Sequence, residues 1–108
     1  MKQNTWAMCA LTPHHLGFPL CPNRLGVQFR GNVPAQSTRR WFTHSWPADC
    51  HVVWSVVPLT VRQGAAQIRW DVHVERATLG YVTYWISITN MTPVPCDIEA
   101  RYAVLGAT

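Results

Sequence analysis

Charge, long apolar runs and leader signals are scarce in this sequence, and each shortage excludes a class of protein. Only 13% of the 108 residues are charged, about half the usual share for a soluble domain. Ala77–Cys96 lacks charged residues, but Thr, Ser, Asn and Pro interrupt it, which argues against a membrane span. The apolar run Trp6–Leu11 is too short for a signal peptide. We therefore expect a cytoplasmic protein, or a secreted one if a leader has been removed.

Catalytic and metal-binding motifs are missing as well. The chain contains neither the GxSxG signature of hydrolases nor a Gly-rich phosphate loop. Its four cysteines have no CxxC spacing, which leaves a zinc ribbon unsupported. Among the five histidines only His14 and His15 are adjacent, and a zinc site needs three or four converging ligands. We expect no catalytic residue, no metal and no cofactor, although a metal site built from the His14–His15 loop and another loop remains an alternative.

Two of the cysteines fall in phase with apolar residues. Cys96 lies on the apolar side of its segment, and Cys50 is in phase with Val52 and Trp54. Free cysteine is often a small buried residue, so we expect both to be buried. A Cys50–Cys96 bridge between two packed sheets is the alternative if the compartment is oxidising.

The segment Gln67–Ala103 contains three runs in which every second residue is apolar and most of the intervening residues are polar. Because side chains point alternately to the two faces of a strand, this pattern predicts three half-buried strands. The apolar positions are Ile68, Trp70, Val72 and Val74, then Val82, Tyr84, Ile86 and Ile88, then Cys96, Ile98, Ala100 and Tyr102. No segment shows a helical period. We infer that these apolar faces form half of a β core.

Further strands are predicted upstream, at Thr5–Leu11, Leu25–Arg30, Thr38–Trp46 and Cys50–Val57. Thr12–Ser37 carries four prolines and otherwise reads as an irregular loop. We predict one all-β domain over residues 1–108. Its architecture is expected to be an antiparallel β-sandwich, Ig-like or jelly-roll-like, with a C-terminal three-strand meander and an irregular Pro-rich N-terminal loop.

The expected register of the meander brings polar residues together around Trp85. If three-residue and five-residue turns join the strands, Trp85 stands between Asp71 and Glu99, and only even slips compete with this register. The predicted ligand-binding residues are Trp85, Asp71, Glu99, Tyr81, His73 and Arg101. An indole on an open sheet can stack on a sugar ring or a base, and it can equally be covered by a neighbouring subunit. We favour the subunit contact.

Three other features bear on function. Arg39-Arg40-Trp41 places cations beside an aromatic residue. This pattern is expected either for nucleic-acid binding or for an edge strand whose charges prevent pairing with another chain. Matching the apolar residues of the Thr38–Trp54 hairpin puts His44 on the core side. Asn90-Met91-Thr92 matches the glycosylation sequon and is expected in an accessible loop.

The composition favours association. The chain has six Trp, three Tyr and three Phe but little charge, so its surface is expected to be partly apolar, and such patches usually mean contact with a partner. We predict a non-catalytic β-sandwich that binds or assembles as a homo-oligomer, through the Trp85 face and the aromatic Thr38–Trp54 hairpin. The expected ligand class, if there is one, is carbohydrate. The alternatives are an enzyme with a pocket between the sheets or at a subunit interface, and, less favoured, nucleic-acid binding.

Overall fold

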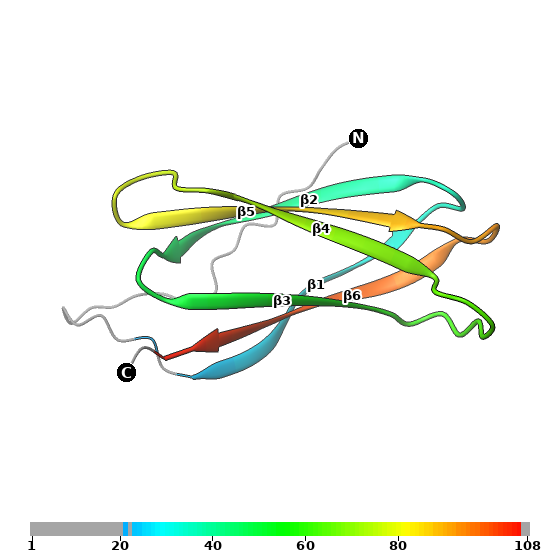
Figure 1. Ribbon diagram of the computed structural model, residues 1–108, viewed down its shortest axis with the longest axis horizontal. Helices are drawn as coiled ribbons and strands as arrows, with labels where there is room; N and C mark the ends of the chain where they lie inside the picture. Colours follow the sequence, from blue (N-terminus) through cyan, green and yellow to red (C-terminus); the bar gives the residue numbers. More distant parts are fainter. Residues whose placement is uncertain (1–20, 22, 107–108) are drawn as a thin grey trace.

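The computed structural model describes residue 21 and residues 23–106, and it confirms the all-β prediction. Two three-stranded antiparallel sheets pack against each other as a sandwich (Figure 1). The predicted strand Thr5–Leu11, Cys9 and the His14–His15 pair lie outside the described residues. The strands are β1 (Arg24–Val33), β2 (Thr38–Pro47), β3 (His51–Pro58), β4 (Ile68–Glu75), β5 (Tyr81–Asn90) and β6 (Cys96–Leu105).

The predicted three-strand meander is wrong, because the observed strand order places its last strand in the other sheet. One sheet has the order β1-β6-β3 and the other β2-β5-β4, so β6 leaves β5 and pairs with β1 and β3 in the opposite layer. The same order separates β2 from β3, and the expected Thr38–Trp54 hairpin therefore does not form. The alternation of apolar and polar residues predicts which side of a strand is buried. It does not predict which sheet the strand joins, because both sheets of a sandwich turn their apolar faces to the same core.

The predicted apolar faces are buried in β5 and β6. Ile86, Ile88 and Ile98 are fully buried, whereas Val74 at the end of the edge strand β4 is 64% exposed. Between the layers four aromatic side chains meet edge to face, with ring centroids 5.3 to 6.3 Å apart. They are Trp46, Trp54, Tyr84 and Tyr102.

The pairing of β4 with β5 differs from the predicted register by two residues. Trp85 lies opposite His73, and Asp71 lies opposite Ser87. The slip is even, so it moves partners along the strand and leaves every side chain on its predicted face.

A bulge in β2 overturns the placement of His44. The register with β5 shifts between Thr43 and Trp46, and Ser45 adopts a φ of 68°. One extra residue reverses the alternation beyond that point. As a result Trp41, Thr43 and Trp46 are buried, while His44 is exposed and its Nδ1 lies 2.9 Å from Ser45 Oγ.

The observed disulfide differs from the Cys50–Cys96 bridge that was considered as an alternative. Cys50 is joined to Cys21, with 5.4 Å between their Cα atoms, and Cys96 is a buried free cysteine. Both Cys50 and Cys96 are buried, as predicted. The bridge ties the chain before β1 to the turn before β3.

The sequon asparagine is not accessible. Asn90 is fully buried at the end of β5, and its amide nitrogen donates to the carbonyl oxygens of Val33, Pro34 and Val94 at 2.8 to 3.3 Å. These bonds hold the loop that carries the chain from β5 to the other sheet. Within the described residues we find no helix that is long and apolar enough to cross a membrane.

Candidate functional site

The outer face of the β2-β5-β4 sheet carries a row of aromatic side chains. Trp85 of β5 has Phe42 of β2 as its cross-strand partner on one side and His73 of β4 on the other. His44 extends the row, with its ring centroid 6.1 Å from that of Phe42. Trp85 is 38% exposed, and the two histidines are exposed as well. We call His44, Phe42, Trp85 and His73 the aromatic row.

The indole of Trp85 is already engaged within its own chain. Its ring stacks on Phe42, with centroids 4.9 Å apart and planes 25° from parallel. Its Nε1 donates a 3.0 Å hydrogen bond to Glu75 Oε1. Since the centroid separation equals the spacing between neighbouring strands, about 4.8 Å, the stack runs across the strands and Phe42 covers one face of the indole.

A polar row lies next to the aromatic row. Arg40 of β2 and Asp71 of β4 are the two cross-strand partners of Ser87, and Arg40 Nε donates to Ser87 Oγ at 3.2 Å. A cation therefore stands at the β2 edge and a carboxylate at the β4 edge, with a small polar side chain between them.

The structure brings together four of the six predicted ligand-binding residues. Trp85, Asp71, His73 and Tyr81 share the outer face of the β2-β5-β4 sheet, as their positions in β4 and β5 require. Glu99 and Arg101 lie on β6, hence on the outer face of the other sheet. The predicted row Asp71–Trp85–Glu99 does not form, because β6 is not a neighbour of β5.

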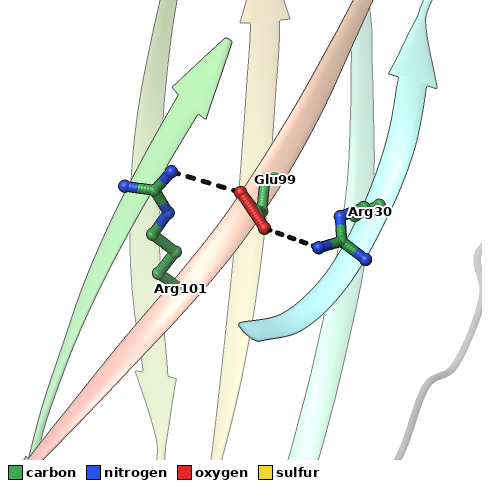
Figure 2. Close-up of polar contacts among 3 residues, drawn as sticks. All are labelled: Arg30, Glu99 and Arg101. Carbon is green, nitrogen blue, oxygen red and sulfur yellow. Dashed lines mark hydrogen bonds and ion pairs between the residues drawn. The ribbon is translucent and has the colours of Figure 1, made fainter. Parts of the chain in front are cut away.

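On that other face Glu99 lies between two arginines (Figure 2). Its carboxylate accepts a 2.9 Å bond from Arg30 of β1 and a 3.2 Å bond from Arg101 of β6. The hydrogen bond from Arg101 lowers the pKa of the Glu99 carboxyl, and the positive charges of both arginines add to this against the opposing effect of desolvation. The carboxyl remains ionised, and its one negative charge offsets one of the two positive charges beside it.

The Arg39-Arg40-Trp41 motif is divided between the two faces of β2. Trp41 is buried and stacks on Phe29, with centroids 5.0 Å apart. Arg39 lies over the Trp41 ring at 5.2 Å and donates to the Asn32 carbonyl. Only Arg40 shares the outer face with the aromatic row, and the Trp41 ring is not open for stacking on a base.

Phe42 is the site residue that the sequence prediction missed, because matching it with Trp46 assigned it to the core. Arg39 and Arg40 place a charge on each side of the strand, so composition alone does not show which side faces solvent. The sequence around Phe42 therefore carries no signal that identifies it as outward-facing.

Among the described residues no three His, Cys, Asp or Glu side chains are grouped so that they could hold a metal ion. Comparisons of this chain with protein-family models, with curated proteins and with solved structures find no match.

Proposed function

We propose that this protein is a non-catalytic β-sandwich that self-associates through the outer face of the β2-β5-β4 sheet. The stacked pair Phe42–Trp85 is the observation that carries the proposal. It places two large apolar rings in the middle of a face that an isolated sandwich normally covers with polar side chains. A second copy that packs on this face removes the pair from water.

The hydrogen bonding of Trp85 favours burial. A tryptophan N–H that loses water without finding a partner costs free energy. Here Glu75 of the same chain already accepts that hydrogen bond, so a partner surface can cover the ring without leaving the donor unpaired. Histidines and charged residues surround the rings and form the polar rim that interfaces usually have.

When two copies of this face pack together about one particular two-fold axis, positive side chains of one copy meet negative side chains of the other. With the axis parallel to β5, the β2 side of one copy faces the β4 side of the other. Arg40 then meets Asp71 of the second copy, and Phe42 meets His73 of the second copy, because each pair flanks one β5 residue. An axis perpendicular to β5 would instead bring Asp71 near Glu75 of the second copy. We infer the parallel axis, since like charges across an interface are unfavourable.

We prefer assembly to carbohydrate binding because of the geometry of the indole. A sugar ring stacks on the flat face of an aromatic ring, and Phe42 occupies one face of Trp85. A flat protein surface, in contrast, can cover the whole row at once.

The test is Trp85→Lys, with Gln63→Lys in the exposed β3–β4 loop as the control for the added charge. The new lysine can still reach Glu75, but two copies would face each other at the centre of the interface. Loss of a central tryptophan costs about 2 kcal/mol or more, so we expect the Kd of this contact to rise about thirtyfold or more.

Mass is measured by light scattering over a dilution series, and far-UV circular dichroism checks the fold. The proposal requires a lower average mass for Trp85→Lys only. Equal masses for the two variants would refute it, and so would a glycan that binds the parent chain without changing its mass but fails to bind Trp85→Lys. If Trp85→Lys does not fold, Phe42→Lys takes its place.

A further inference from the structure

Residues 23–106 form four edge strands, and one of these lacks the features that protect the other three. An edge strand presents unpaired backbone groups, and proteins guard such edges with charged side chains and bulges. Edge strands β1 and β2 each contain a bulge as well as arginines, and β4 alternates charged residues along its outer face. The guarding residues are Arg24, Arg30, Arg39, Arg40, Arg69, Asp71 and Glu75.

β3 has neither kind of protection. Its eight residues, HVVWSVVP, include no Lys, Arg, Asp or Glu, and its pairing with β6 runs without a register shift. β6 is its only hydrogen-bonded neighbour among the described residues. Four of the eight residues are valine, which has a high β propensity. Within the part of the chain that the structure describes, the strand is therefore regular, apolar and unpaired along one side.

The surface beside this edge is apolar too. Val53 points away from the core and is 51% exposed, and Leu25 (82%) and Leu105 (48%) are exposed on the same end of the β1-β6-β3 sheet. A strand added along β3 would cover Val53 while leaving Leu25, on the far edge of the sheet, in solvent.

We propose that β3 pairs with β3 of a second copy of this chain, antiparallel, to form a continuous six-stranded sheet. Contacts between identical strands about a two-fold axis are self-complementary, and such closed dimers are the commonest oligomers. The order of residues in β3 supports this occupant. With Ser55 on the axis, Val53 lies opposite Val57 of the second copy on the outer face.

The same register serves the inner face. Trp54 then lies opposite Val56 of the second copy, so apolar residues meet there as well. Two paired residues point to the same face of the sheet only when both have odd numbers or both have even numbers. The register centred on Ser55 pairs odd with odd and even with even. Pro58, which has no N–H to donate, falls at the end of the paired segment.

This contact is independent of the face-to-face contact proposed above. If both form, each copy has two different two-fold contacts, and copies alternate between them in an open chain with no fixed number of subunits. If only the β3 contact forms, the protein is a closed dimer. The two proposals therefore fail separately.

The first test compares Val53→Lys with Leu25→Lys. Both replace an exposed apolar residue by lysine on the same sheet face, but only Val53 lies on the β3 edge. Native mass spectrometry is recorded for each variant alone and together with Trp85→Lys. We expect a dimer for Trp85→Lys/Leu25→Lys and a monomer for Trp85→Lys/Val53→Lys.

Equal masses for the Val53→Lys and Leu25→Lys variants would overturn the proposal. Loss of dimer in both would point to face packing of the apolar end, and no loss in either would mean that β3 is not a contact. If the Trp85→Lys background has no effect, the comparison of the two single variants still decides the question.

The second test fixes the register by cross-linking. Directly opposed residues have Cβ atoms about 4.5 to 5.5 Å apart, close to what a disulfide spans. Ser55→Cys is expected to give a covalent dimer under mild oxidation. Val53→Cys is the matched control, because the two copies of residue 53 would be about 14 Å apart. A covalent dimer from Val53→Cys, or none above the parent level from Ser55→Cys, would contradict this arrangement.

Discussion

Asn90 is expected to be a main stabilising residue of the fold, and Asn90→Ala tests this. The side chain is fully buried and makes hydrogen bonds at both ends: its amide nitrogen donates to three carbonyl oxygens, and its oxygen accepts from the backbone N–H and the hydroxyl of Thr92. These bonds join the end of β5 to the end of β1 in the other sheet. They hold the loop through which β6 changes layer.

The magnitude follows from the bonds that are lost. The two amide hydrogens and the bond accepted from the Thr92 N–H make three good hydrogen bonds, and the Thr92 hydroxyl, whose one hydrogen is shared with the Val94 carbonyl, adds part of a fourth; each full bond is worth about 1 kcal/mol net when buried. The carbonyls of Val94 and Pro34 keep other donors, the hydroxyls of Thr92 and Ser37, so we expect a loss of about 3 to 4 kcal/mol. For a domain of this size that lowers Tm by about 12 °C or more.

The assay is urea denaturation followed by tryptophan fluorescence, with thermal unfolding beside it. Asn32→Ala is the matched control, because Asn32 is exposed and its amide makes one side-chain bond, to Asp97. That variant should change the free energy of unfolding by no more than about 0.5 kcal/mol. Similar losses in the two variants would refute the argument that Asn90 holds the crossing between the sheets.

Two further predictions concern stability. Reduction of Cys21–Cys50, which closes a loop of 29 residues, should lower the free energy of unfolding by about 3 to 4 kcal/mol; identical urea midpoints with and without reductant would contradict this. Because the folded-state pKa of Glu99 is lowered, its ion pairs stabilise the protein above its ordinary pKa of about 4.3 and are lost as the pH falls through the folded value. The urea midpoint of the parent should therefore drop more steeply below about pH 4 than that of Glu99→Gln, and parallel curves would exclude this contribution.

The sequence allowed a good prediction of which side chains are buried in the C-terminal strands. The alternation of Ile86 and Ile88 with polar residues identifies their inward face without reference to any partner strand, and the structure confirms it. The partner of each strand was harder to predict. Nothing local distinguishes a β6 that stays beside β5 from one that crosses to the other layer, because both choices bury Ile98.

The candidate site was only partly predicted, because the sequence does not show which strands are neighbours. Trp85 and His73 lie on the predicted face, but β6, the third strand of the expected row, belongs to the other sheet. Phe42 took the place of Glu99 because β2, and not β6, pairs with β5. Its outward position was missed because the bulge at Ser45 reverses the alternation between Phe42 and Trp46, and a single residue with positive φ leaves no periodic signal in the sequence. The partner of Cys50 came from the irregular segment before β1, where spacing carries no information about pairing.

The central claim is that two copies meet through the aromatic row with Arg40 of one copy facing Asp71 of the other. Charge reversal followed by native mass spectrometry tests it most directly, with Val53→Lys in the background to remove the β3 contact. Arg40→Asp alone and Asp71→Arg alone should each reduce the dimer, because each brings like charges together across the interface. The double variant Arg40→Asp/Asp71→Arg should restore the dimer. Equal dimer fractions in all four proteins, or a double variant as weak as the single ones, would contradict it.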